Sequence, residues 1–238
     1  MMFTYLKENE GHTYVTSYDV VKFLAIILMV VDHLGAFFFP HMTELRMIGR
    51  LSAPIWLILA GYANTRDISL MFYVGSTILV VVGLIAGGPI FPLNILVSII
   101  FIRLMIDKLA ITTLVDYSSI FKLFVVLAVL VFPLNVLMDY GSAAFLFALY
   151  GFMLRHTSEG INSKCLRAVF ACGLVIFYAA YEGFIFRFNI TDTSFVLIGV
   201  AGVVAMMSFF RPHNFTNLSN SVPPLITAHI RWLGRHSL

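Results

Sequence analysis

The chain alternates long apolar runs with short polar stretches, and the first long run contains two adjacent ionisable residues. It extends from Asp19 to Pro40 and carries Asp32 and His33 side by side in its interior. About 20 predominantly apolar residues are enough to cross a bilayer as a helix. An acid near the middle of such a helix costs about 2.5–3.5 kcal/mol of insertion free energy. The pair is therefore expected to face a protein interior or a wet cavity, as a functional site would.

Further apolar runs follow, separated by prolines, glycines and short polar loops. They predict an all-α polytopic membrane helix bundle of about eight transmembrane helices, in a single domain over residues 1–238. The expected spans are 19–40, 48–63, 69–86, 93–105, 119–137, 142–154, 166–186 and 193–210. Residues 211–238 are expected to form a tail that has room for a shortened last helix.

Composition supports the membrane class. Hydrophobic residues make up 60% of the chain and charged residues only 11%, against about 25% charged residues in soluble domains. The net charge of +3 comes from basic residues scattered singly at helix ends, so nucleic-acid binding is not expected. Cys165 and Cys172 are the only cysteines, and two thiols give no metal signature. No metal site is predicted.

The distribution of basic residues gives the chain an expected orientation, because cytoplasmic loops are enriched in Lys and Arg. A cytoplasmic N-terminus places Arg46, Arg50 and Arg187 outside. The basic residues that it places at cytoplasmic ends are Lys7, Lys22, Arg66, Arg103, Lys108, Lys122, Arg155, Lys164 and Arg167. The chain is therefore predicted to be a multi-pass protein of a plasma membrane, surrounded by lipid, with its N-terminus in the cytoplasm.

Asp32 and His33 are the first candidates for chemistry. His33 lies roughly 21 Å along the helix from Asp19, past the membrane midpoint, and a neutral histidine is a natural general base near neutral pH. Adjacent helical residues point about 100° apart, so Asp32 is not expected to hold His33. Its expected partner is Arg50 of the following span. Alternatively, both residues join helices through hydrogen bonds.

Other polar residues have a structural interpretation beside a functional one. Arg50 is either an interfacial anchor or a partner for Asp32 or a phosphate. Arg66 is either one of the positive charges that orient the chain in the membrane or a contact for an anionic cofactor. Asn94, directly after Pro92 and Leu93, is either a helix cap or a polar group of a site. Glu182, near the outer end of its span, is expected to be solvated at the membrane interface.

A resemblance to a known family passes through these same residues. It is carried by Asp19 to Lys22 followed by LAIILMVVDHLGAFFF, then by LRMIGRLSAPIWLILAGYANTR, and more weakly by FPLNIL, MDYGSAAFLF and WLGRHSL. These segments resemble the TraX family of membrane proteins, most densely over residues 19–67. That family is associated with acetylating the N-terminus of conjugative pilin, and it is similar in kind to transmembrane acyltransferases that use a membrane histidine with acyl-CoA. Relatives continue past the GRHSL-type segment into a further helix, which suggests that this chain is a shortened form or that the helix is dispensable.

The resemblance implies a function and a set of residues. His33 and Asp32 would lie at the reacting centre of an acetyl-CoA-dependent acyltransferase in the bacterial inner membrane. The acceptor would be an amine or hydroxyl at the outer face, on pilin or on a surface glycan, which requires a path across the bundle from a cytoplasmic donor. The residues implied in binding substrate or cofactor are Arg50, Arg66, Asn94, Tyr140, Arg235 and His236.

Two other classes of function stay open at this point. A proton-coupled small-molecule transporter would use Asp32 and His33 as its coupling pair, although the chain shows no clear inverted repeat. A non-catalytic membrane component would need neither residue.

Overall fold

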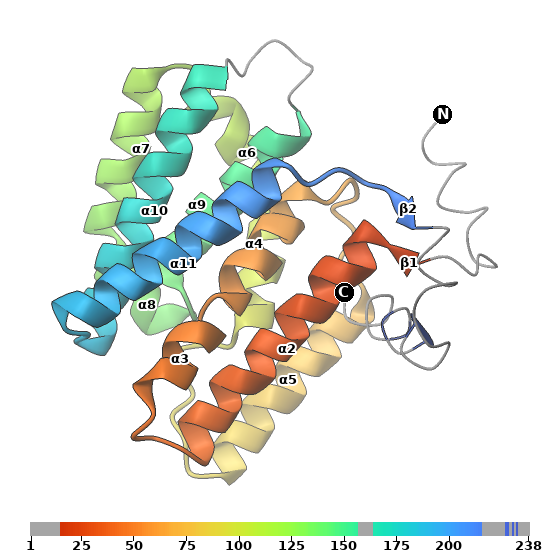
Figure 1. Cartoon of the computed structure of the whole chain (residues 1–238), viewed down its shortest axis with the longest axis vertical. Coiled ribbons are helices and arrows are strands. Elements are labelled where there is room, and N and C mark those ends of the chain that lie inside the picture. The colour runs from red at the N-terminus through yellow and green to blue at the C-terminus, as the bar shows by residue number, and fades with distance from the viewer. Residues whose placement is uncertain (1–14, 157–163, 216–226, 229, 231, 233–238) are drawn as a thin grey trace.

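The computed structural model describes residues 15–156, 164–215, 227, 228, 230 and 232, and this part of the chain is almost entirely helical (Figure 1). Two short strands, β1 (Val15–Thr16) and β2 (Asn214–Phe215), pair antiparallel. The helices are α2 (Ser17–Phe37), α3 (Thr43–Gly49), α4 (Ser52–Tyr62), α5 (Leu70–Ile85), α6 (Ile95–Thr113), α7 (Tyr117–Val129), α8 (Val131–Leu137), α9 (Gly141–Arg155), α10 (Lys164–Phe186) and α11 (Ile190–Ser208). The all-α class expected from the sequence is confirmed.

Helix α2 starts at a capping box. The Thr16 hydroxyl accepts a hydrogen bond from the Asp19 backbone N–H at 3.2 Å, and the Asp19 carboxylate accepts one from the Thr16 backbone N–H at 2.9 Å. Two backbone donors at the helix start are thereby satisfied. The Ser17 hydroxyl also donates to the carbonyl of Arg211 at 3.0 Å, so the start of α2 is fixed to the segment that follows α11.

Helices α4 and α9 form the centre of the bundle. Every residue of α4 from Ser52 to Gly61 is buried, although the helix has only 11 residues. Its contact with α9 is close because Gly61 lies against the backbone of Ala148 and Gly151 lies against that of Ile58: a Cβ would lie 1.8 and 2.0 Å from the two carbonyl oxygens. Small residues permit such backbone contact between membrane helices. The crossing of α4 and α9 therefore depends on these glycines.

Three helices, α2, α10 and α11, are long and apolar enough to cross a membrane among the described residues, and α7 with α8 makes a fourth if the bent pair counts as one. Each expected span contains a helix, but several are short, and α4 is about 16 Å long at 1.5 Å per residue. The expected number of about eight spans and the cytoplasmic N-terminus stay predictions.

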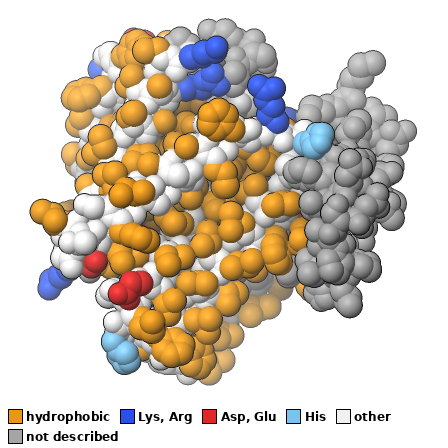
Figure 2. All heavy atoms as spheres, in the orientation of Figure 1, with side chains coloured by type: hydrophobic (Ala, Val, Ile, Leu, Met, Phe, Trp, Pro, Cys, Tyr) orange, Lys and Arg blue, Asp and Glu red, His pale blue; other side chains and the backbone are white. Residues whose placement is uncertain are grey.

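The surface has the character of a protein in lipid. Figure 2 shows apolar side chains spread across the face formed by α11, α2 and their neighbours. Large apolar residues are widely exposed on several helices, among them Val30, Val82, Phe121 and Ile198. Exposing an apolar surface of this extent to water is unfavourable, whereas contact with the hydrocarbon of a bilayer is not.

The expected boundaries differ from the observed ones at three places. Helix α3 (Thr43–Gly49) was not expected, and it takes the first residues of the expected span 48–63. Helix α6 continues to Thr113 instead of ending near residue 105, and Asp107 in its polar second half pairs with Arg66 at 2.9 Å. The expected span 119–137 is divided into α7 and α8 with a bend of 60°. Pro133 explains the bend, since it has no N–H to donate to the carbonyl of Val129.

The close crossing of α4 and α9 gives a first prediction. Gly61→Ala places a methyl group into the backbone of Ala148, so the helices must separate and the melting temperature in detergent should fall clearly. Gly83→Ala is the matched control, because nothing lies within 4 Å of a Cβ at Gly83. Alanine is favoured over glycine in helices by about 1 kcal/mol, so this variant should melt at the wild-type temperature or slightly above. Equal melting of the two variants would contradict the crossing.

Candidate functional site

Helices α2 and α3 form a tight hairpin that positions Asp32. Gly49 of α3 lies against the α2 backbone so closely that a Cβ would be 2.3 Å from the Cα of Asp32. Arg46 and Arg50 are four residues apart, so they lie on the same face of α3 and its C-terminal cap. The contact at Gly49 therefore brings the Asp32 carboxylate beside two guanidinium groups.

Asp32 interacts with both arginines. Arg46 Nη1 lies 3.1 Å from Asp32 Oδ2 and also donates to the Asp32 carbonyl at 3.3 Å. Arg50 Nε lies 3.9 Å from Asp32 Oδ1. The partner expected from the sequence, Arg50, is present, but Arg46 is closer and was missed. Its spacing of four residues from Arg50 is the signal that would have found it.

Arg50 joins helices that are distant in the sequence. Its Nη1 donates to the Tyr140 hydroxyl at 3.1 Å, and its guanidinium carbon lies 5.6 Å from the centre of the Tyr140 ring. The backbone carbonyl of Arg50 accepts a hydrogen bond from the Tyr178 hydroxyl of α10 at 3.2 Å. Contacts from α2, from the start of α9 and from α10 thus converge on one residue between α3 and α4.

Tyr140 is held in an unusual backbone conformation. Its φ angle is 63°, in the left-handed region, and Gly141 follows at 38°. Non-glycine residues in this region cost on the order of 1–3 kcal/mol and persist where neighbours fix them. Here the chain before Tyr140 is fixed by pairing with the start of α6: the Leu93 N–H donates to the Leu137 carbonyl, and the Asp139 N–H donates to the Leu93 carbonyl, at 2.9 and 2.8 Å.

Glu182 is a further carboxylate at this site. It is fully buried, and the charges that act on it include those of Arg50, Asp32 and Arg46. Neither of its carboxylate oxygens has a hydrogen bond of ordinary geometry among the described residues, but the Tyr178 hydroxyl lies close enough to interact with the carboxylate. The expectation that Glu182 is solvated at the membrane interface is wrong, because α10 turns this face toward α9 and the Arg50 region. A buried carboxylate without well-formed hydrogen bonds is costly.

These residues form one charge-balanced group, called here the Arg50 cluster: Asp32, Arg46, Arg50, Tyr140, Tyr178 and Glu182. Asp139 adds a titratable group at its edge, in the turn between α8 and α9. Burial raises the pKa of Asp139 to about 6, and the nearby Arg50 guanidinium opposes that rise. Two guanidinium groups, the buried Glu182 carboxylate and the partly buried Asp32 carboxylate leave the cluster without a large net charge, as a low-dielectric interior requires.

His33 points away from the Arg50 cluster. It is exposed, and its Nδ1 lies 2.7 Å from the Met29 carbonyl oxygen one turn earlier. A carbonyl oxygen only accepts hydrogen bonds, so the Nδ1 of a neutral His33 carries the proton and Nε2 keeps its lone pair. The expected divergence of Asp32 and His33 is therefore observed. The expectation that both residues face inward is wrong for His33, which lies on the exposed face of α2 with the lone pair of Nε2 available.

Arg66 does not join the Arg50 cluster. It lies beyond the other end of α4, where its Nη2 is 2.9 Å from Asp107 and its Nη1 donates to the Ala63 carbonyl at 3.0 Å. Arg66 therefore closes the C-terminus of α4 and fixes it to α6. Its expected support of the reacting centre is not provided by direct contact.

Asn94 has the capping role that was one of its two interpretations. Its side chain accepts a hydrogen bond from the Leu96 N–H at 3.1 Å and donates to the Ser76 carbonyl at 2.9 Å. It thus starts α6 and attaches it to α5. Arg235 and His236, the remaining candidates, lie outside the described residues.

Arg66 belongs to a second group of charges, called here the basic end: Lys22, Arg66, Arg103 and Arg155. Arg155 donates to the Tyr62 carbonyl at 2.9 Å, and Arg103 donates to the Asp67 carbonyl at 2.6 Å. Charge interactions of Arg103 with Lys22 and with Arg66 place all four near the start of α2 and the end of α4. The expected orientation puts these residues on the cytoplasmic side.

The sequence of this chain matches a known protein family. The family model described as TraX protein matches residues 17–218. The chain belongs to the TraX family. The matched range contains His33 and the whole Arg50 cluster, whereas Arg235 and His236 lie beyond it.

One relative of this TraX-family chain comes from Rickettsia prowazekii (strain Madrid E) and is named Uncharacterized protein RP591. The two are 27% identical over 152 residues, which make up 64% of this chain and 61% of that protein. The chain thus spans less than two thirds of the relative. No solved structure matches this TraX-family chain.

The Arg50 cluster gives a second prediction. Arg50→Met removes the larger of the two positive charges that act on the buried Glu182, although Asp32 keeps Arg46, and breaking a buried ion pair from one side costs about 3–5 kcal/mol. The melting temperature in detergent should therefore fall strongly. Adding Glu182→Gln removes one of the two carboxylates, so the double variant should melt above Arg50→Met alone.

Lys122→Met on the exposed surface of α7 is the control for loss of a cation and should melt as wild type. If Glu182→Gln lowers the melting temperature equally with and without Arg50, then Glu182 and Arg50 do not interact and the cluster is wrongly assigned.

Proposed function

We propose that this TraX-family chain is a membrane-embedded acyltransferase that moves an acetyl group from acetyl-CoA to an amine or hydroxyl. The acceptor is the N-terminus of pilin or a surface glycan, and the membrane is the bacterial inner membrane. Membership of the TraX family supports this reaction class. The observation that carries the proposal is His33, whose Nε2 is a free base on the same turn of α2 as the anchored Asp32.

In the proposed reaction His33 acts as the general base. The acceptor nitrogen or oxygen attacks the carbonyl carbon of the acetyl thioester while its proton passes to His33 Nε2. The carbon–sulfur bond then breaks, and the thiolate of coenzyme A takes the proton from His33. The histidine returns to its neutral form, so no other reactant is needed.

Asp32 has a positioning role in this proposal. Its carboxylate holds α2 against Arg46 and Arg50, and this contact fixes the helical turn that carries His33. Arg50 in turn is held by Tyr140 and Tyr178, which belong to other helices. The cluster thereby keeps the base in one place, and a well-placed general base contributes roughly 10²–10⁴-fold to a rate.

The basic end is the proposed approach for the donor. Coenzyme A carries several phosphate groups, and guanidinium groups recognise phosphate through paired hydrogen bonds. Arg66, Arg103, Arg155 and Lys22 supply cations on the side that the expected orientation places in the cytoplasm, where acetyl-CoA is found. Arg66 would then serve the donor and not the reacting centre.

A proton-coupled transporter is the second candidate, and Glu182 is the observation that favours it. A carboxylate that is fully buried in a membrane protein is a group that could bind and release a proton during transport. In that case Glu182, rather than His33, would be the residue on which activity depends.

The acyltransferase proposal predicts that His33→Ala loses about 10²–10⁴-fold of acetyl transfer while melting as wild type, because His33 is exposed. The measurement is transfer of labelled acetyl from acetyl-CoA to a pilin N-terminal peptide or a glycan by the full chain in proteoliposomes. His156→Ala is the control: its Nδ1 lies 3.0 Å from the Phe152 carbonyl in the same local arrangement. Equal transfer by wild type and His33→Ala would show that His33 is not the general base.

The same proteoliposomes separate the two candidate functions. The acyltransferase should produce stable acetylated product without a pH gradient, whereas a transporter should move solute with the gradient and form no product. Glu182→Gln should abolish flux in a transporter. In an acyltransferase its effect on transfer should be smaller than that of His33→Ala.

A further inference from the structure

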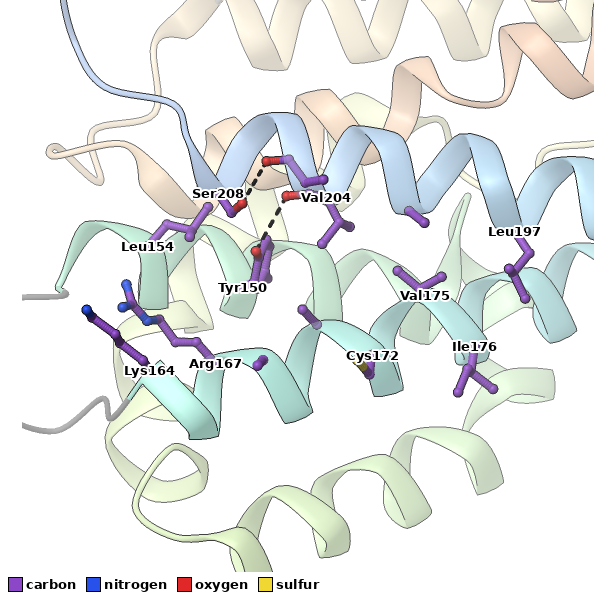
Figure 3. A pocket seen from close by; sticks show the side chains of 14 residues that line it. Tyr150, Leu154, Lys164, Arg167, Cys172, Val175, Ile176, Leu197, Val204 and Ser208 are labelled. Carbon is purple, nitrogen blue, oxygen red and sulfur yellow. Dashed lines mark hydrogen bonds between the residues drawn. The ribbon is translucent and has the colours of Figure 1, made fainter.

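A groove opens between α10 and α11, the last two helices of the described bundle. Helices α10 and α11 are joined by a short turn and diverge from it, and α9 forms the floor between them (Figure 3). The groove has a volume of about 590 Å³. Both walls are helices long and apolar enough to cross a membrane, so a bilayer around these helices would bring its hydrocarbon to the groove.

Alanines make the groove hollow. Ala168 and Ala171 line it from α10, and Ala201 and Ala205 line it from α11. Residues three or four apart lie on the same face of a helix, so each pair forms a strip of small side chains facing the other helix. Larger residues at these positions would close the space.

The two ends of the groove differ in chemistry. Lys164 and Arg167, in the first turn of α10, lie at one end together with the Tyr150 and Ser208 side chains, whereas Val175, Ile176 and Leu197 line the other (Figure 3). From Lys164 to Ile176 the helix rises about 18 Å. This is close to the thickness of one leaflet, since the hydrocarbon core is about 30 Å thick.

We propose that the groove binds an anionic phospholipid. The phosphate lies between Lys164 and Arg167, and one acyl chain lies along the alanine strips toward Leu197. Cations between membrane helices bind anionic headgroups in this way, and the apolar walls take the chain. The groove is built on residues outside the Arg50 cluster, so this lipid site does not depend on the acyltransferase proposal.

The test is photolabelling of the full chain in phosphatidylcholine vesicles that contain a photoactivatable phosphatidylglycerol. Labelled peptides should map to α10 and α11 around the groove. Because a basic residue near the membrane surface favours anionic lipid by about fivefold, Lys164→Gln with Arg167→Gln should lower this labelling by about tenfold or more. Lys108→Gln with Lys122→Gln removes two exposed cations elsewhere and should leave it unchanged.

A second pair of variants tests the apolar part without changing charge. Ala201→Leu fills the groove and should reduce labelling, whereas Gly202→Leu places the same side chain where no atom lies within 4 Å of a Cβ and should not. The proposal is overturned if photoactivatable phosphatidylcholine labels the groove equally well, or if the charge variants keep full labelling. It is also overturned if acetyl-CoA, and not phosphatidylglycerol, protects the groove from label. Labelling does not require acetyl transfer, so the photolabelling experiment tests the lipid site even if the acyltransferase proposal is wrong.

Discussion

The interaction on which the bundle most depends is the one between Arg50 and the carboxylates of Asp32 and Glu182. A guanidinium group is stable in an apolar interior only when it has charge partners and hydrogen bonds. Arg50 has Asp32 from α2, the Tyr140 hydroxyl from the start of α9, and the charge of Glu182 from α10. Movement of any of these helices away from Arg50 would cost it a hydrogen bond or a charge partner, so one residue helps to fix the relative position of several helices.

This ionic contact requires a close approach of backbones that only glycine allows. Gly49 brings α3 against Asp32, and Gly61 and Gly151 bring α4 against α9. In lipid, burying apolar surface between helices gains little, so packing and polar contacts carry the association. The glycines supply the packing, and the Arg50 cluster supplies the polar contacts. Each depends on the other, because a separated hairpin would remove Asp32 from its arginines.

The sequence predicted the residues that stand out against apolar surroundings. Asp32 and its partner Arg50 were found because a charge within a membrane helix needs a compensating charge. Arg46 was missed because it lies between the expected spans 19–40 and 48–63, where an arginine needs no explanation, whereas the structure places it in α3. Glu182 was misread because a carboxylate near a helix end is usually solvated, and only the packing of α10 shows that this face turns inward. The catalytic role of His33 rests on family resemblance and on its tautomer, and stays a prediction.

The arrangement also restricts how the proposed transfer takes place. Arg50 and Arg66 lie at opposite ends of α4, so the reacting centre and the basic end are separated by the length of that helix. The sequence suggested a path through the bundle, but α4 is buried on all sides and touches the backbone of α9. A donor cannot pass between them without breaking the crossing. Since His33 is exposed on α2, the proposed donor must approach along α2, and the acetyl group must meet the acceptor on its outward face.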